Sequence, residues 1–172
     1  MPVPLLDLKR QYTPIREQVR EAVDRVCDSQ YFILGPEVDA FEKEAAEALG
    51  VAHTVGVSSG TDALLAALMA LGVGRGDEVV VPTFTFFATA GVVERLGARP
   101  VFVDITARDY CMDPDALAAA IGSRTRAVIP VHLFGQAADM AAIAEAAGSV
   151  PIIEDCAQSW GADFEGRLTG SL

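Results

Sequence analysis

The sequence is short of positive charge and of cysteine, and each shortage excludes a class of protein. Lysine and arginine number 13 against 24 aspartate and glutamate residues, which gives a net charge of −11 over 172 residues. No basic stripe of the kind that binds nucleic acid is visible, so we expect no nucleic-acid partner. The 3 cysteines lie far apart without a CxxC pair, which argues against a disulfide framework and against a zinc or similar metal site.

Long apolar runs and a secretory leader are also missing. No stretch of ~18 residues is apolar and free of charge, so we expect no membrane-spanning helix. The first residues lack the basic segment followed by an apolar one that marks a signal peptide. Because 51% of the residues are hydrophobic and 22% charged, the chain should fold around a core. With its cysteines expected to be reduced, this predicts a cytoplasmic globular protein.

From residue 53 onward, short β-rich runs alternate with Ala/Leu-rich helical stretches. The β-rich runs cover 53–57, 78–82, 100–104, 126–131 and 150–155. The helical stretches between them cover 61–71, 86–96, 113–121 and 138–147. This alternation is typical of βαβ crossovers, so we expect an α/β fold with a mainly parallel sheet and helices on both faces. The stretch 61–71 is apolar nearly all round and is expected to be buried.

Two helices are expected before this alternation begins. Thr13 followed by Pro14 has the pattern of an N-cap and a first helical residue, which predicts a helix over 14–28. Pro36 opens a second predicted helix, which Gly50 closes.

The end of the sequence departs from the alternation. Glu165-Gly166 is a turn signal that predicts a small hairpin. The sequence then stops at Leu172 without a closing helix or strand, which indicates that the chain is cut there.

The segment Ser58–Asp62 follows a predicted strand and opens a predicted helix. A helix N-terminus presents free backbone N–H groups and about half a positive charge, and Gly60 would let an anion approach the backbone closely. The segment is therefore a candidate phosphate site. The alternative is an ordinary serine N-cap with a glycine in the turn. A dinucleotide fingerprint is not present, because the glycines at 72–76 follow a helix and precede a strand, the reverse of the required order.

Other candidates lie at the carboxyl ends of predicted strands, where open α/β sheets bind ligands. Phe86 could stack on a planar ring or cap the core. Asp155 ends an apolar strand and needs a partner, because burying an unpaired carboxylate is costly. That partner is a protonated heterocyclic nitrogen, a neighbouring arginine or a helix N-terminus. His132 also ends a strand, and a lone histidine is more often structural than catalytic.

Together these residues resemble the pyridoxal-phosphate-dependent nucleotide-sugar aminotransferases of the DegT/StrS type, which share the aspartate aminotransferase (type I) fold. The resemblance spans nearly the whole chain. It is carried by the order and spacing of LDLKRQY (6–12), ILGPEVDAFE (33–42), SSGTDAL (58–64), GDEVVVPTFTFFATA (76–90), PVFVDI (100–105), IPVHLFGQ (129–136) and PIIEDCAQSWGA (151–162).

The resemblance implies a role for each candidate. Gly60 and Thr61 would hold the phosphate of pyridoxal 5′-phosphate, and Phe86 would stack on its ring. Asp155 would pair with the ring nitrogen, and Gln158 would bond the phenolic oxygen. Family members transfer an amino group, usually from glutamate, to a nucleotide-linked keto-sugar, and they are homodimers.

The resemblance also implies a lysine that forms a Schiff base with the cofactor, and this sequence has no lysine in that motif. Its only lysines are Lys9 and Lys43. The family lysine would lie about a dozen residues beyond Leu172. We therefore expect an inactive N-terminal portion, with residues 1–35 as an arm and helix and 36–172 as the first part of the large cofactor-binding domain. The alternatives are a sugar dehydratase of the same family, a non-catalytic regulatory homologue and, less favoured, a generic nucleotide-binding module.

Overall fold

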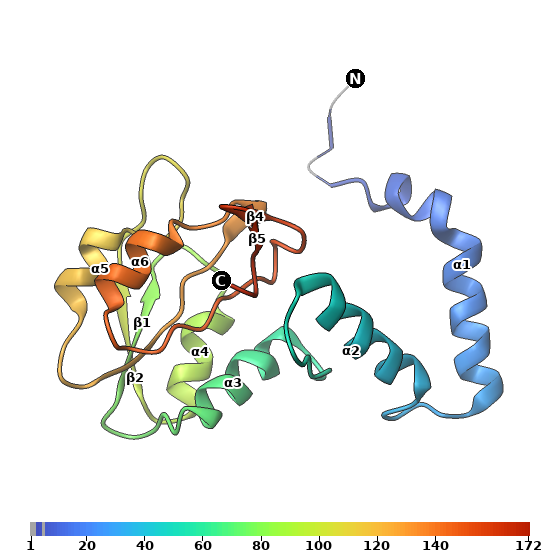
Figure 1. Cartoon of the computed structure of the whole chain (residues 1–172), viewed down its shortest axis with the longest axis horizontal. Coiled ribbons are helices and arrows are strands. Elements are labelled where there is room, and N and C mark those ends of the chain that lie inside the picture. Colours follow the sequence, from blue (N-terminus) through green and yellow to red (C-terminus); the bar gives the residue numbers. More distant parts are fainter. Residues whose placement is uncertain (1–2, 5) are drawn as a thin grey trace. The chain divides into compact units, whose positions relative to one another are not determined.

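The computed structural model describes residues 3–4 and 6–172 (Figure 1). The chain divides into two compact units, which are described separately. The first consists of the chain up to Ala48 together with Ala52–Gly56, and the second consists of Leu49–Val51 together with Val57–Leu172. The domain boundary expected at residue 35 stays a prediction. None of the helices in the described ranges is long and apolar enough to cross a membrane.

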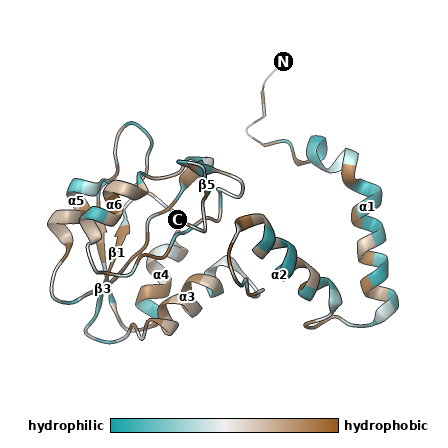
Figure 2. Ribbon diagram, in the orientation of Figure 1, coloured by the Kyte–Doolittle hydropathy of each residue, from teal (hydrophilic) through white to brown (hydrophobic). Residues whose placement is uncertain are grey.

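The first unit contains α1 (Leu8–Ser29) and most of α2 (Pro36–Leu49). The predicted start of the first helix is wrong, because Asp7 caps α1 by accepting the Arg10 N–H. Pro14 lies inside the helix, and the Thr13 hydroxyl donates to the Lys9 carbonyl 2.8 Å away. Figure 2 shows α1 with alternating hydrophilic and hydrophobic segments. The prediction of α2 from Pro36 is confirmed.

The run 53–57 does not form the predicted strand. The Gly56 N–H donates to Glu42 Oε1 at 2.6 Å, and the Thr54 hydroxyl donates to the Glu42 carbonyl at 2.5 Å. The Glu42 side chain on α2 thus satisfies one backbone donor of the run, the Gly56 N–H.

The second unit is built on a parallel sheet of β1 (Glu78–Pro82), β2 (Arg99–Val103) and β3 (Thr125–Val128). The strand order is β2-β1-β3, as expected for βαβ crossovers. The predicted run 150–155 lies beside β3 but joins it only through isolated parallel bridges, Val128 to Ile152 and Val131 to Asp155. Pro151 cannot donate to a ladder, which limits regular pairing there.

Helices cover both faces of this sheet, which confirms the predicted fold class. On one face lie α3 (Gly60–Ala70) and α4 (Ala88–Arg95), packed against alternate β1 residues Val79 and Val81. On the other lie α5 (Pro114–Ala120) and α6 (Met140–Ala147), packed in the cluster that contains Val80. This division follows the period of two along a strand.

The prediction that the helix at 61–71 is buried is wrong for most of its surface. Of the residues in α3, only Leu64 and Leu68 are buried, and Met69 is 60% exposed. These two leucines lie one turn apart and form a single stripe towards the sheet, so the helix covers the sheet as an outer layer.

The hairpin predicted at the end of the sequence is confirmed. Strands β4 (Asp163–Phe164) and β5 (Arg167–Leu168) pair antiparallel. Glu165 and Gly166 both have positive φ, 52° and 82°, as a two-residue type I′ turn requires. The short 3₁₀ helix Leu133–Gly135 follows β3.

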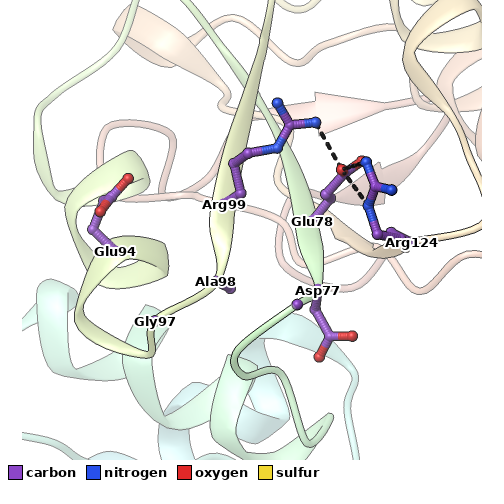
Figure 3. A pocket seen from close by; sticks show the side chains of 8 residues that line it. Asp77, Glu78, Glu94, Gly97, Ala98, Arg99 and Arg124 are labelled. Carbon is purple, nitrogen blue, oxygen red and sulfur yellow. Dashed lines mark hydrogen bonds and ion pairs between the residues drawn. The ribbon is translucent and has the colours of Figure 1, made fainter.

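An ion cluster around Glu78 lies at the amino edge of the sheet (Figure 3). Glu78, the first residue of β1, is only 7% exposed, and its Oε1 accepts from Arg99 at 2.7 Å and from Arg124 at 2.6 Å. Hydrogen bonds from Arg99 and then Arg124 hold the pKa of Glu78 below its ordinary value. This cluster, which no sequence pattern predicted, ties the starts of the three strands together.

Candidate cofactor site

The carboxyl edge of the sheet carries several of the candidate residues. Phe86 follows β1, and Asp155 lies at the end of the segment bridged to β3. Parallel strands end at the same edge, and a helix that follows a strand runs back from that edge. The first turn of α4 therefore lies beside these strand ends.

Asp155 is half-buried and is held from several sides. Its Oδ2 accepts from the Thr89 hydroxyl on α4 at 3.1 Å, and its Oδ1 accepts from the Ala157 N–H at 3.2 Å. Thr89 is fully buried and also bonds the Thr85 hydroxyl at 3.1 Å. Among the described residues no cationic side chain lies within 4.0 Å of Asp155. Its charge is thus hydrogen-bonded without being neutralised, which leaves it suited to a cationic ligand group.

The N-terminus of α3 has free donors but also a carboxylate. Ser59 caps the helix by accepting the Asp62 N–H at 3.1 Å. Within the described chain the N–H groups of Gly60 and Thr61 have no acceptor, and a Cβ at residue 60 would meet nothing within 4 Å. This open approach fits a phosphate.

Asp62 is the feature of this turn that the sequence argument missed. Its Oδ2 accepts the Ser58 hydroxyl at 2.6 Å and the Ser59 hydroxyl at 3.0 Å, and these two bonds lower the pKa of Asp62. The Ser-x-x-Asp spacing was the available signal, because it places a carboxylate in the first turn of the helix, close to the capping serine. The Asp62 carboxylate would repel a phosphate bound here, so hydrogen bonds from the backbone N–H groups of the helix would have to offset that repulsion.

Phe86 and Gln158 are both exposed in the described chain. The Phe86 side chain is 73% exposed, and its carbonyl accepts the Thr89 N–H. Gln158 Oε1 accepts the Phe134 N–H at 3.0 Å. This bond orients the amide, so its Nε2 group remains to donate to an acceptor such as a phenolate oxygen.

The structure therefore brings together some of the candidates but does not join all of them. Asp155 and the residues around Phe86 are linked through Thr89. Helix α3, which begins at Gly60 and Thr61, packs against α4 on the same face of the sheet. No hydrogen bond among the described residues connects that turn directly to Asp155. The roles implied for Gly60, Thr61, Phe86, Asp155 and Gln158 stay predictions.

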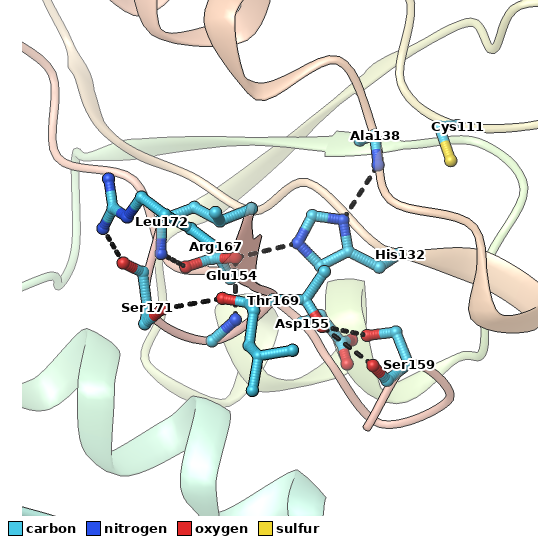
Figure 4. A network of polar contacts seen from close by, with 12 residues as sticks. Cys111, His132, Ala138, Glu154, Asp155, Ser159, Arg167, Thr169, Ser171 and Leu172 are labelled. Atoms are coloured by element: carbon cyan, nitrogen blue, oxygen red, sulfur yellow. Dashed lines mark hydrogen bonds and ion pairs between the residues drawn. The ribbon is translucent and has the colours of Figure 1, made fainter. Parts of the chain in front are cut away.

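A second polar network surrounds Glu154 (Figure 4). His132 is fully buried, its Nδ1 accepts the Ala138 N–H at 3.0 Å, and its Nε2 lies 2.9 Å from Glu154 Oε2. Because Nδ1 faces a donor, the proton of neutral His132 lies on Nε2 and is donated to Glu154. Burial disfavours ionisation of Glu154, but hydrogen bonds from His132, Gly170 and Leu172 outweigh it and lower its pKa.

Cys156 completes a His–Glu–Cys cluster whose ligand atoms lie within 4.8 Å of one another. A metal on His132 Nε2 would require that nitrogen to lose its proton while Nδ1 still faces an N–H donor, so the tautomer does not suit a metal. Burial, and then the charge of Glu154, raise the pKa of the Cys156 thiol to about 11. The thiol is therefore protonated near neutral pH and is not a nucleophile there.

The fold is that of an open α/β protein, and the candidate residues Phe86 and Asp155 lie at the ends of its strands. The chain belongs to the DegT/DnrJ/EryC1/StrS aminotransferase family, whose sequence pattern it matches over residues 13–172. It is 48% identical, over 99% of its length, to UDP-N-acetyl-3-dehydro-α-D-glucosamine 3-aminotransferase of Acidithiobacillus ferrooxidans. It covers 47% of that relative, so the chain spans about half the length of the curated relatives it matches.

Solved structures agree with the family assignment. DesV of Streptomyces venezuelae, in complex with a ketimine intermediate, superposes with a TM-score of 0.94 at 45% identity, covering 99% of this chain and 46% of that one. A GDP-4-keto-6-deoxymannose-3-dehydratase holding a PLP-glutamate geminal diamine superposes with a TM-score of 0.82 at 30% identity, covering 88% of this chain and 41% of that one. The resemblance read from the sequence is confirmed at the level of family and fold.

Proposed function

We propose that this chain is the cofactor-binding part of a pyridoxal-phosphate-dependent aminotransferase that acts on a nucleotide-linked keto-sugar, with glutamate as the amino donor. The observation that supports it best is the Asp155 carboxylate, held at the carboxyl edge by Thr89 without a neutralising cation in the described chain. Pyridoxal phosphate supplies an electron sink while its ring nitrogen stays protonated, and an adjacent carboxylate favours that protonation.

The other candidates have chemistry that suits the same ligand. The free N–H groups of Gly60 and Thr61 would bind the phosphate, and the exposed ring of Phe86 would cover one face of the pyridine. Gln158 would donate from Nε2 to the phenolic oxygen, because its Oε1 is already bonded to the Phe134 N–H. We propose that the whole protein is a cytoplasmic homodimer.

Neither lysine of the sequence lies in a motif like the one that carries the Schiff-base lysine of the family. Lys9 and Lys43 are both exposed on helices of the first unit, and Lys43 Nζ lies 4.0 Å from Glu47. We infer that the 172-residue chain by itself does not catalyse transamination. Incubation with pyridoxal phosphate, borohydride reduction and peptide mapping should yield no stoichiometric adduct. An adduct on either lysine, together with turnover, would refute this inference.

Binding of the cofactor can be tested without covalent attachment. Pyridoxamine 5′-phosphate cannot form a Schiff base with lysine, so its fluorescence titration measures the site alone. We expect saturable binding that Asp155→Asn weakens and that Asp163→Asn leaves unchanged. Asp163 is exposed on β4, and its substitution makes the same change in charge. Equal affinity of both variants and the unaltered chain would contradict the role of Asp155.

A dehydratase of the same family is the second candidate, favoured by the structural similarity to the GDP-sugar dehydratase. Supplied with glutamate and a nucleotide-linked keto-sugar, an aminotransferase yields an amino-sugar nucleotide, whereas a dehydratase yields a deoxy-sugar nucleotide. Mass spectrometry of the product formed by the whole protein distinguishes the two. Formation of neither product would favour the regulatory alternative.

A further inference from the structure

Two adjacent carboxylates at the carboxyl edge of the sheet face opposite ways. Asp155 turns to Thr89 on α4, whereas Glu154 turns to His132 and to the end of the described chain. This opposition follows from the alternation of side chains along an extended segment. Figure 4 shows Glu154 between the His132 ring and the backbone of the segment Thr169–Leu172, here called the 169–172 segment.

Every partner of the Glu154 carboxylate is a donor. Oε2 accepts from His132 Nε2 at 2.9 Å and from the Gly170 N–H at 2.9 Å, while Oε1 accepts from the Leu172 N–H at 2.9 Å. His132 cannot reverse its role, because its Nδ1 accepts the Ala138 N–H. Only an ionised carboxylate satisfies this set, since an amide at position 154 would place an NH₂ group against at least one donor.

Glu154 and His132 also join two backbone segments: the one that carries Asp155 and the one that follows β3. The Asp155 N–H donates to the Pro130 carbonyl at 2.9 Å, and the His132 N–H donates to the Asp155 carbonyl at 3.1 Å. The bond between the side chains of His132 and Glu154 lies next to these two bonds and connects the same strand ends. It therefore adds a buried cross-strand link where regular sheet pairing is reduced to isolated bridges.

We propose that Glu154 and His132 form a positioning pair that fastens the strand end carrying Asp155 to the end of β3 and to the 169–172 segment, and so keeps the Asp155 carboxylate directed at the cofactor site. The part that concerns the cofactor rests on the proposed function. Neither residue of the pair is a catalytic residue in this proposal, because both act through the backbone of Asp155.

Amide hydrogen exchange tests the fastening without any ligand. In Glu154→Gln we expect the backbone amides of Gly170 and Leu172, which donate to Glu154 directly, to exchange about tenfold faster or more. We expect the same acceleration at the amides of Asp155 and His132, which do not contact the Glu154 side chain. Glu145→Gln is the matched control, since Glu145 is exposed on α6 and the substitution removes the same charge. Unchanged exchange at Asp155 and His132 would overturn the proposal, even if Gly170 and Leu172 became faster.

The cofactor arm uses pyridoxamine 5′-phosphate labelled with ¹⁵N in the ring. In Glu154→Gln we expect several-fold weaker binding and a ring-nitrogen shift nearer to that of the free ligand. Leu117→Ala, a cavity in the core on α5, controls for a general loss of stability and should leave the ring-nitrogen shift of the bound ligand unchanged. The same shift in Glu154→Gln as in the unaltered chain would show that the pair does not position Asp155.

The two arms separate this proposal from the function on which it rests. If the unaltered chain binds no pyridoxamine 5′-phosphate, the proposed function fails for this chain, and the exchange rates at Asp155 and His132 still decide whether the pair fastens the strand end. If the ligand binds and Asp155→Asn abolishes binding while Glu154→Gln changes neither exchange nor the ring-nitrogen shift, the function stands and the positioning pair is refuted.

Discussion

The two edges of the same parallel sheet each carry a carboxylate, but only one of the two carboxylates is paired with cations. At the amino edge, Glu78 is bonded to two arginines, Arg99 and Arg124. At the carboxyl edge, Asp155 has a hydroxyl and a backbone N–H as partners, and no cation in the described chain. The Glu78 carboxylate is paired with cations, whereas the Asp155 carboxylate retains an unmatched charge. A carboxylate held in place but not neutralised is the one able to bind a protonated ligand.

Replacing Asp155 gives the sharpest test of this contrast. Asp155→Asn keeps the shape but removes the charge, so we expect the affinity for pyridoxamine 5′-phosphate to fall between about tenfold and hundredfold, the usual value of a hydrogen bond to a charged group. Thermal stability should change little, because the amide oxygen can accept the Ala157 N–H while the NH₂ group faces the Thr89 hydroxyl, which can also accept. A large fall in Tm with unchanged affinity would mean that the Asp155 charge serves the fold, as that of Glu78 does.

The neighbouring carboxylate should make stability depend on pH. The folded pKa of Glu154 lies below the ordinary value of ~4.3. Its contribution to the free energy of unfolding is therefore complete above pH ~4.3, the ordinary pKa of glutamate in the unfolded chain. This contribution is lost as the pH falls through the folded pKa. Hydrogen bonds to a charged group suggest a loss of about 2 kcal/mol.

Urea unfolding at several pH values measures this term. Other carboxylates also titrate in the acid range, so the quantity to follow is the difference between the unaltered chain and Glu154→Gln. We expect that difference to be constant above pH ~5 and to shrink at lower pH. A difference that does not vary with pH would show that Glu154 is not held ionised by His132, Gly170 and Leu172.

The elements that the sequence predicts correctly are those governed by local rules. The apolar run 78–82 forms β1, Pro36 starts α2, and Glu165-Gly166 forms a tight turn. The predictions that were wrong depend on contacts with residues outside the local pattern. The run 53–57 has strand composition, but it pairs with no strand in the described chain, and its Gly56 N–H is bonded to the Glu42 side chain. Thr13-Pro14 has the pattern of a helix start, but Asp7 caps α1 earlier.

For the candidate site too, some residues can be identified from the sequence, whereas their partners require the structure. Asp155 is identifiable because an acid at the end of an apolar strand is unusual, and the family resemblance then gives it a role. Its partner Thr89 lies 66 positions away, and Glu154 lies 22 positions from His132. Which side chains meet over such separations depends on strand order and register, which periodicity does not specify.

The hydroxyl that holds Asp155 gives a smaller, graded test. Thr89 is fully buried, so Thr89→Val removes one donor from the carboxylate with little change in shape. We expect the free energy of unfolding to fall by about 1 kcal/mol. Affinity for pyridoxamine 5′-phosphate should fall a few-fold, because Asp155 becomes less well oriented. Thr89→Ser retains the hydroxyl and should retain both properties, so equal losses in the two variants would point to packing of the methyl group instead.

Neutralising the carboxylate at the amino edge should have the smallest effect and none on ligand binding. In Glu78→Gln the arginines lose their anion, but their side chains are 66% and 65% exposed and can turn to solvent. We expect a small fall in Tm that shrinks as salt is added, since these pairs are partly screened. Glu94 is exposed on α4 and lines the pocket drawn in Figure 3 together with Glu78, and Glu94→Gln should lower Tm less. If Glu78→Gln weakened pyridoxamine 5′-phosphate binding as much as Asp155→Asn does, the two edges would not be independent. The unmatched charge of Asp155 would then not be the specific cause of ligand binding.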